Sequence, residues 1–234
     1  MATDLSTDPR LDALLAATRS LTAAGMPFEV VDEDVLGERL RVFRNRSHSM
    51  REVLLGASRF GDRDCYVFGD GTRIRFDELV PLVASLACGL QERYDVGPGD
   101  RVAVCAANCR EWILTFWAVA SLDAVLVAMN GWWTGPEMRN ALGLTDPKLL
   151  VMDEKRRARL DGDPGMPTLV TEHDFAGLGD ETTAELPEPP IAEDDPFILI
   201  FTSGTTGRPK AAVLSHRSVI SYLMEQSFIG ARSM

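Results

Sequence analysis

The residues best suited to chemistry lie together near the end of the 234-residue chain, in the run Thr202-Ser203-Gly204-Thr205-Thr206-Gly207-Arg208-Pro209-Lys210. This run, which we call the phosphate loop (residues 202–210), holds four hydroxyl side chains, two glycines and two cations. Glycine lets the backbone turn sharply and bring its N–H groups close to an anion. Hydroxyl groups can donate hydrogen bonds to phosphate oxygens, and Lys210 supplies positive charge. The composition of the run therefore predicts a site for a phosphate-bearing ligand.

Three other interpretations of the run are weaker. A flexible Ser/Thr/Gly linker is disfavoured because the run lies between two apolar segments, residues 197–201 and 211–214. A Walker A loop needs a lysine directly after its second glycine, and here Arg208 and Pro209 separate Gly207 from Lys210. The chain contains no G-x-G-x-x-G sequence, so a dinucleotide-binding loop has no support.

The elements that would position this loop form an alternating β-α-β pattern. Apolar segments of strand length alternate with amphipathic helices, which is typical of a parallel sheet covered on both faces. We therefore predict an α/β fold, with a mostly parallel sheet and helices on both of its faces. The loop follows a strand, and the carboxyl ends of parallel strands are where such sheets bind ligands. The predicted strands are residues 101–106, 124–129, 148–152, 168–170 and 197–201, and the predicted helices are residues 77–94, 111–122 and 134–144.

The elements before residue 77 are predicted from local signals. A leucine-rich helical pattern precedes Gly25, and Ser49 begins a capping-box sequence that predicts a second helix. Residues 65–76 have the pattern of two strands joined by a tight glycine turn. Pro81 is expected in the first turn of the following helix, where proline is tolerated.

The charge of the chain is unevenly distributed. Lys and Arg number 24 against 35 Asp and Glu, which gives a net charge of -11. Such a balance argues against broad binding to nucleic acid or to anionic membranes. Residues 171–195 contain nine acidic side chains and no Lys or Arg, so the rest of the chain carries about -2. We expect residues 171–195 to form a solvated loop.

Cysteine and histidine usage predicts no metal centre. The four cysteines form no CxxC pair, and His48, His173 and His216 complete no zinc spacing. Cys88 and Cys105 lie among apolar residues and are predicted in the core, whereas nothing marks Cys65 or Cys109 as reactive. The first residues lack the features of a signal peptide, and no apolar run reaches the ~20 residues that span a bilayer. We expect a reducing, cytoplasmic setting and no membrane span.

The phosphate loop closely resembles the signature of the AMP-forming adenylating superfamily, which includes acyl-CoA synthetases. Its pattern T-S-G-T-T-G-x-P-K is long and chemically unusual. Ser215-His216-Arg217 also resembles the continuation of that signature. Weaker resemblances cover residues 75–79, 96–102 and 117–130. Asp123 stands at the family's usual glycine, Ala128 at its usual proline and Ala211 where a glycine commonly follows the lysine.

The resemblance implies ATP-dependent activation of a carboxylic acid to an acyl-adenylate, with release of pyrophosphate and transfer of the acyl group to coenzyme A. It implies that Lys210 offsets phosphate charge. Arg208 is expected to face solvent, as charged side chains mostly do. A fatty acid is the expected substrate. Mg²⁺ ligands and the residues for adenine and ribose are expected beyond the end of the chain. The residues expected to hold the β- and γ-phosphates are Thr202, Ser203, Gly204, Thr205, Thr206 and Gly207.

The same resemblance sets expectations for the organisation of the chain. Residues 1–49 are expected to form an amino-terminal helical segment, and residues 50–234 the first α/β lobe of an adenylating domain that ends soon after the phosphate loop. As an amino-terminal portion of a longer enzyme, the chain is expected to be inactive alone. We expect no later element to cover the apolar side chains of its last helix, which predicts self-association. Those side chains are Val219, Ile220, Leu223, Met224 and Phe228.

Several alternatives stay open. The chain could be a non-catalytic nucleotide-binding or interaction module with the same fold, or an unrelated kinase-like phosphate binder. His216 is expected to pack or cap at the start of the last helix rather than to act as a base. Trp132 and Trp133 are expected to pack in the core or at an interface, with the lining of an acyl tunnel as the alternative.

Overall fold

A computed structural model describes residues 9–178, 184–202 and 210–233 of the chain. The chain divides into two compact units, Ser49–His216 on the one hand and Met1–His48 with Arg217–Met234 on the other. Most of the last helix groups with the amino-terminal residues. The sheet, with the described ends of the phosphate loop at Thr202 and Lys210, belongs to the unit Ser49–His216.

The unit Ser49–His216 is built on a six-stranded sheet with the strand order β10-β9-β6-β5-β7-β8. Five strands pair in parallel, and β10 pairs antiparallel with β9 at the edge. Buried strands without polar side chains are expected where helices cover both faces. The strands are β5 (Arg101–Cys105), β6 (Val125–Ala128), β7 (Leu149–Met152), β8 (Thr168–Val170), β9 (Pro196–Thr202) and β10 (Lys210–Ser215).

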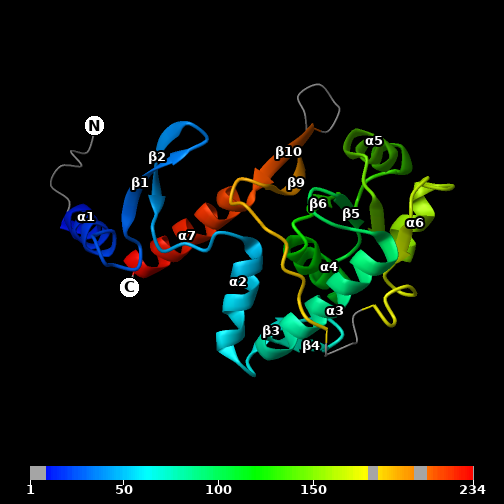
Figure 1. Ribbon diagram of the computed structural model, residues 1–234, viewed down its shortest axis with the longest axis horizontal. Helices are drawn as coiled ribbons and strands as arrows, with labels where there is room; N and C mark the ends of the chain where they lie inside the picture. The colour runs from blue at the N-terminus through cyan, green and yellow to red at the C-terminus, as the bar shows by residue number, and fades with distance from the viewer. Residues whose placement is uncertain (1–8, 179–183, 203–209, 234) are drawn as a thin grey trace. The chain divides into compact units, whose positions relative to one another are not determined.

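Helices cover both faces of this sheet, as the sequence predicts. On one face, alternate strand residues such as Ala103, Val127 and Leu150 form a single apolar cluster with Met138 and Leu160, which belong to α5 (Gly135–Thr145) and α6 (Glu154–Leu160). On the opposite face lie α3 (Phe76–Tyr94) and α4 (Arg110–Ser121) (Figure 1). The core of this unit therefore has two layers, one on each side of the sheet.

The remaining elements of this unit surround α3. Helix α2 (Met50–Ala57) begins at Ser49, whose side chain accepts a hydrogen bond from the Glu52 N–H, as the capping-box pattern predicts. The short 3-10 helix η2 (Ser58–Phe60) leads to the hairpin of β3 (Asp64–Val67) and β4 (Arg73–Arg75), which is confirmed. Pro81 lies inside α3 rather than in its first turn, because the helix already begins at Phe76.

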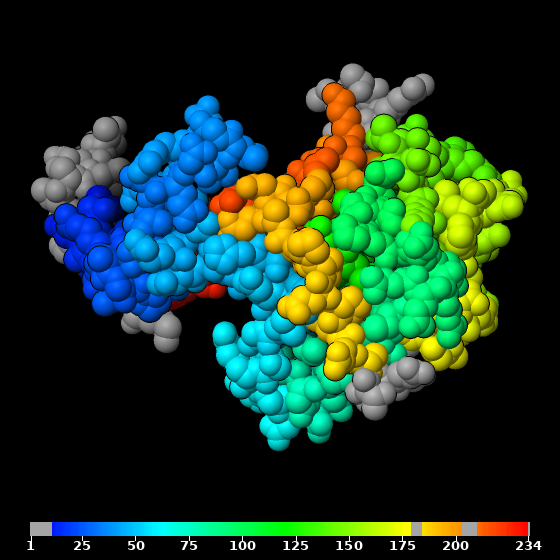
Figure 2. Space-filling model, in the orientation of Figure 1, coloured from blue at the N-terminus to red at the C-terminus, as the bar shows by residue number. Residues whose placement is uncertain are grey.

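The described part of the acidic segment contains turns and extended chain without helix or strand. Residues 184–195 run along the surface between α2 and α3, where Figure 2 shows them in amber between cyan and green elements. Arg51 of α2 donates hydrogen bonds to the backbone carbonyls of Leu186 and Pro187, and the thiol of Cys88 on α3 lies 3.4 Å from the Glu185 carbonyl. These contacts tie the segment to the unit that holds the sheet.

The other unit contains a helix, a hairpin and most of the last helix. Helix α1 (Pro9–Leu21) is followed by β1 (Val30–Val35) and β2 (Glu38–Phe43), an antiparallel hairpin that no local sequence signal predicts. The last helix, α7 (His216–Arg232), places Phe228 against Phe28 and Phe43, with ring centroids 5.5 and 6.2 Å apart. Earlier residues of the chain, rather than a later element, thus cover Phe228. Within the described residues, no helix is long and apolar enough to cross a membrane.

Candidate functional site

The two ends of the phosphate loop face each other across a pair of strands. Thr202 ends β9, Lys210 begins β10, and the two residues are partners in the antiparallel ladder. The Thr202 hydroxyl lies 3.4 Å from the Lys210 carbonyl oxygen, to which it donates a hydrogen bond. Both residues are exposed. The other candidate residues, Ser203, Gly204, Thr205, Thr206 and Gly207, lie outside the described residues, as does Arg208.

The loop leaves the sheet at the edge where ligands bind in open α/β sheets. Strand β9 runs parallel to β6, with Ala128 opposite Ile200 near the carboxyl ends of both strands. The loop is followed by a strand, whereas in a P-loop the corresponding segment is followed by a helix. This connection speaks against the kinase-like alternative and agrees with the failed Walker A spacing.

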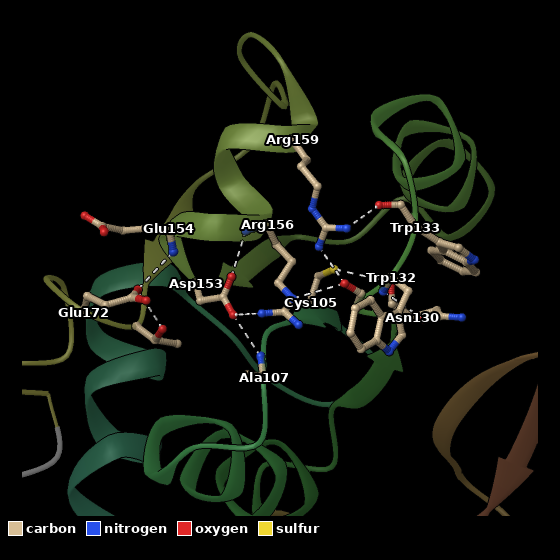
Figure 3. A network of polar contacts seen from close by, with 12 residues as sticks. Cys105, Ala107, Asn130, Trp132, Trp133, Asp153, Glu154, Arg156, Arg159 and Glu172 are labelled. Carbon is tan, nitrogen blue, oxygen red and sulfur yellow. Dashed lines mark hydrogen bonds and ion pairs between the residues drawn. The ribbon is translucent and has the colours of Figure 1, made fainter. Parts of the chain in front are cut away.

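A buried carboxylate organises the neighbouring connections at this edge. Asp153, directly after β7, accepts a hydrogen bond of 2.9 Å from the Ala107 N–H, which follows β5 (Figure 3). Its other oxygen accepts from the Arg156 N–H and thereby caps α6. The Arg156 guanidinium lies 2.5 Å from Asp153, and both side chains are nearly buried. The ends of β5 and β7 are thus fixed to each other through one side chain.

Two arginines of α6 hold the connection that follows β6. Figure 3 shows Arg156 and Arg159 extending from α6 toward this segment. Arg156 donates to the Gly131 carbonyl at 3.2 Å, and Arg159 donates to the carbonyls of Gly131 and Trp133. We did not predict either role from the sequence. The sequence feature that could have indicated these roles is the cationic run Arg156-Arg157-Ala158-Arg159. This run lies outside all of the predicted strands and helices.

The two tryptophans of this connection have different environments. Trp133 is 9% exposed and belongs to the apolar cluster under α5 and α6, so its predicted packing role is confirmed. Trp132 is 83% exposed, and its N–H donates to the Asn130 side chain. Among the described residues, Trp132 therefore does not pack in the core.

The cysteines near this edge are poor nucleophiles. Burial raises the pKa of Cys105 to about 11 and the pKa of Cys109 also to about 11. A thiol with such a pKa remains protonated near neutral pH, and the thiolate is the reactive form. Cys105 is fully buried, as predicted, whereas Cys88 is only half-buried.

His216 packs in the core, which confirms the expectation for this residue. Its ring is fully buried and stacks on Phe197, with centroids 5.0 Å apart. Its Nδ1 atom accepts a hydrogen bond from the Met50 N–H, so the proton of the neutral ring is on Nε2. The Nε2 atom lies 3.7 Å from a carboxylate oxygen of Asp123. Burial lowers the pKa of His216 and raises that of Asp123 to about 6.

The described residues offer a cation and a hydroxyl for a nucleotide but no metal cluster. Lys210 and Thr202 have the chemistry that phosphate oxygens require. No group of three or more His, Cys, Asp or Glu side chains that could hold a metal ion occurs within the described residues. For Mg²⁺, these residues therefore provide no set of ligands.

A groove of about 690 Å³ lies on the α5 side of the sheet. Its lining includes Arg101, Val125 and Pro196, each at the amino-terminal start of its strand, together with Lys210 and Val213 of β10. Most of the groove is thus at the edge of the sheet opposite the carboxyl ends. Lys210, which pairs with Thr202 at the other end of the phosphate loop, also lines the groove, so the groove reaches this end of the loop.

Comparison with known proteins identifies relatives of this chain. It is 31% identical over 193 residues to 4-coumarate–CoA ligase 2 of Oryza sativa subsp. japonica, covering 73% of this chain and 34% of the relative. It is 34% identical over 146 residues to a feruloyl-CoA synthase of an Amycolatopsis species, covering 62% of this chain and 29% of the relative. The chain thus spans about a third of the length of these curated relatives.

Solved structures share the fold. The amino-terminal subdomain of Klebsiella oxytoca NpsA, in complex with 3-hydroxybenzoyl-AMSN, matches with a TM-score of 0.62 and 26% identity, over 73% of this chain and 42% of that one. VinN matches with a TM-score of 0.71 and 20% identity, over 78% of this chain and 50% of that one. The model of the AMP-binding enzyme family matches residues 55–233, which include the sheet and the whole phosphate loop. The chain therefore belongs to the AMP-binding enzyme family of adenylate-forming ligases.

Proposed function

We propose that this chain supplies the phosphate-binding part of an ATP-dependent ligase that converts a carboxylic acid to an acyl-adenylate and then to an acyl-CoA. The observation that carries the proposal is the pairing of Thr202 with Lys210 at the carboxyl edge of the sheet. These residues delimit a segment whose side chains are suited to phosphate, and family membership supports the same chemistry.

The proposed reaction has two steps. In the first, a carboxylate oxygen of the acid attacks the α-phosphorus of ATP, the bond to the β-phosphate breaks, and pyrophosphate leaves. In the second, the thiol of coenzyme A loses its proton and its sulfur attacks the acyl carbon, so that AMP leaves. Negative charge accumulates on the pyrophosphate in the first step, and preorganised donors and cations stabilise such charge.

We propose that residues of the phosphate loop stabilise this negative charge. Lys210 is proposed to place its ammonium group against the phosphates, and the hydroxyls of Thr202, Ser203, Thr205 and Thr206 to donate to their oxygens. Gly204 and Gly207 are proposed to let backbone N–H groups approach closely. When bound, Mg²⁺ neutralises phosphate charge, and we expect its protein ligands from outside the described residues.

The acid is the least constrained part of the proposal. The sequence resemblance favours a fatty acid, whereas the relatives with 31% and 34% identity are named for 4-coumarate and ferulate. Saturation-transfer NMR of the chain with 4-coumarate and with octanoate distinguishes the two acid classes. Binding of octanoate alone supports the fatty acid, and binding of 4-coumarate alone contradicts it.

The alternative is a nucleotide-binding or interaction module that does not catalyse the reaction. Titration of the chain with ATP, followed by calorimetry, tests nucleotide binding, and ATP–pyrophosphate exchange tests the first chemical step. We expect ATP binding without exchange by the 234-residue chain alone. Exchange by this chain would contradict its inactivity, and absence of ATP binding would contradict the role of the loop.

We further propose a cytoplasmic location and retain the division into an amino-terminal segment, residues 1–49, and a first lobe of the adenylating domain, residues 50–234. The partners that we propose are ATP, coenzyme A and a small carboxylic acid, with no nucleic acid.

A further inference from the structure

The six-stranded sheet ends in two edges of different kinds. At one edge lies β8, which has three residues, Thr168–Val170, and therefore offers few backbone groups for pairing. At the other edge lies β10, with the six residues Lys210–Ser215, which pairs with β9 alone in the part of the chain that the structure describes (Figure 1). An edge strand of this length presents a row of backbone N–H and C=O groups to a further strand. The β10 edge is thus suited to strand addition.

The middle of β10 lacks the features that usually keep an edge strand from pairing. Natural edges carry charges, prolines or bulges. In β10 such features stand at the two ends, as Lys210 at the first position and as the register shift between Leu214 and Ser215. The residues between these ends are apolar, and Ala212 and Val213 are exposed, the latter to 59%. A strand added at this edge would therefore remove apolar side chains from water.

We propose that β10 pairs with β10 of a second copy of this chain, in antiparallel orientation and about a two-fold axis at Ala212. Residues that lie opposite each other in an antiparallel pair point to the same face of the sheet, so the axis must lie at a residue and not between two residues. With the axis at Ala212, the residues from Lys210 to Leu214 all have partners, which gives about four to six backbone hydrogen bonds. The two sheets then continue as one.

The side chains of β10 are complementary to one another in this register. The exposed Val213 lies opposite Ala211 of the second copy, so that a large side chain meets a small one, and symmetry repeats this pair. Ala212 lies opposite Ala212 of the second copy, where two small side chains fit easily. Lys210 lies opposite Leu214 of the second copy, and the two lysines are roughly 14 Å apart along the strands. Because Lys210 is the one charged residue of β10, no like charges meet across the pair.

Two other ways of pairing the same strands are less favourable. With the axis at Val213, the two valines would face each other, and Lys210 would lie opposite His216, which is buried and follows the end of the strand. A parallel pair in register would place Lys210 beside Lys210 of the second copy, and like charges at neighbouring positions oppose strand pairing. The antiparallel pair at Ala212 avoids both conflicts.

Opposite charges introduced at the axis residue test this proposal. The parent chain is Leu223→Glu, so that the exposed side chains of α7 add no second contact, and sedimentation at about 0.15 M salt, where surface charges are screened, gives the dissociation constant of the dimer. Ala212→Lys and Ala212→Asp each place like charges directly opposite each other and are expected to weaken dimerisation about fivefold or more. Ala212→Gln is the matched control, because it adds a long side chain without charge. An equal mixture of the Ala212→Lys and Ala212→Asp chains is expected to form heterodimers as tightly as the parent chain, which native mass spectrometry detects.

Each outcome decides for or against the proposal. A dimer that either charge weakens, that Ala212→Gln retains and that the mixture restores supports it. A parent chain that stays monomeric at every concentration overturns it, as do charged variants that dimerise as tightly as the parent. Weakening by both charges without restoration in the mixture also overturns it, because the two Ala212 residues then do not face each other.

Hydrogen exchange provides a second test should the charged variants fail to fold, which peptides from α3 and α4 report. In the parent chain, the amides of residues 210–214 are expected to exchange more slowly as the concentration rises, because the second copy protects those that point away from β9. Exchange that does not depend on concentration overturns the proposal. Neither test uses ATP, so both are independent of the proposed function.

Discussion

The Nδ1 atom of His216, the residue that follows β10, accepts a hydrogen bond of 3.1 Å from the backbone N–H of Met50 at the start of α2. An imidazole nitrogen that accepts from an N–H cannot carry a proton, so the folded chain holds His216 neutral. Burial acts in the same direction and lowers the pKa of His216. The residue that resembles part of a family signature therefore has a structural role, which leads to a prediction about acid stability.

Substitution of His216 is expected to change both stability and its pH dependence. His216→Leu leaves the buried Met50 N–H without an acceptor and is expected to cost about 1–3 kcal/mol. His216→Asn offers an amide oxygen near the position of Nδ1 and is expected to be milder. Because the unfolded chain binds the His216 proton below pH ~6.5 and the folded chain resists it, this residue removes stability as the pH falls through that value. Urea unfolding from pH 8 to pH 5 measures the free energy of unfolding. If it falls equally with pH in His216→Asn and in the wild type, His216 is not the source of the acid sensitivity.

Asp123 is expected to oppose the loss of stability that His216 causes as the pH falls. Burial and, to a smaller extent, the charge of Asp195 raise its pKa to about 6. The folded chain therefore binds a proton at Asp123 between about pH 6 and pH 3.8, where the unfolded chain does not, and this contribution is lost as the pH rises through 6. Asp123→Asn removes a buried charge and is expected to raise the free energy of unfolding at pH 8 by about 1–3 kcal/mol. It is also expected to make the decrease in stability with falling pH, which His216 causes, steeper. The same urea titrations measure both quantities.

A matched control for Asp123 exists on the next connection. Asp123 and Asp146 both have a positive φ, of 55° and 42°, but the Asp146 side chain is 94% exposed. Asp146→Asn is expected to change stability by less than about 0.5 kcal/mol, as surface substitutions usually do. An equal gain in both variants would show that the backbone conformation, rather than the buried charge, limits stability at Asp123.

Asp153 is expected to be the most sensitive polar residue at the carboxyl edge. Asp153→Ala removes the acceptor for the Ala107 N–H, the cap of α6 and the partner of Arg156. Breaking such a nearly buried pair is expected to cost about 3 kcal/mol. Glu154→Gln is the control, because the ion pair of Glu154 with His173 is more than half exposed and is expected to contribute less than about 1 kcal/mol. Similar costs for the two variants would contradict the organising role of Asp153.

The chain is expected to self-associate through the exposed apolar residues of α7. Tyr222, Leu223 and Ile229 are 60%, 39% and 46% exposed, although Phe228 beside them is covered. Exposed apolar groups of this kind favour association. Light scattering at increasing concentration is expected to show a mass above that of the monomer, reduced in Leu223→Glu. A monomer at every concentration would refute the expectation.

The sheet could be predicted because its signals are local. Apolar runs such as Leu149–Met152 are buried at every residue and can be identified without tertiary knowledge. Helix α6 escaped prediction because only Leu160 is buried among its seven residues, so it has no apolar stripe. Its stability comes from the Asp153 cap and from the bonds of its arginines to a distant segment.

The hairpin of β1 and β2 escaped prediction for a different reason. Its turn places Leu36 and Gly37 at φ values of 52° and 87°, and leucine is not a residue that signals a positive φ. Conversely, the departure of Asp123 from the family's usual glycine is explained by the structure. Its φ of 55° is one that glycine adopts freely and aspartate tolerates.

Only part of the candidate site could be predicted from the sequence, because the rest depends on tertiary contacts. The phosphate loop could be proposed because its residue types suit anion binding, and the sheet topology places its described ends, Thr202 and Lys210. The contributions of Arg156, Arg159 and Trp133 depend on backbone carbonyls and on packing across three connections, which no local pattern encodes.

The most direct test of the account compares ATP binding by the wild-type chain, Lys210→Ala and Lys155→Ala in calorimetry at fixed salt. Lys155 lies exposed on α6 and controls for a general loss of positive charge. The account predicts that Lys210→Ala weakens ATP binding by about tenfold or more, as expected for loss of a charge-assisted contact to phosphate, while Lys155→Ala leaves it unchanged. Equal ATP affinity in all three chains would contradict the assignment of residues 202–210 as the phosphate-binding site.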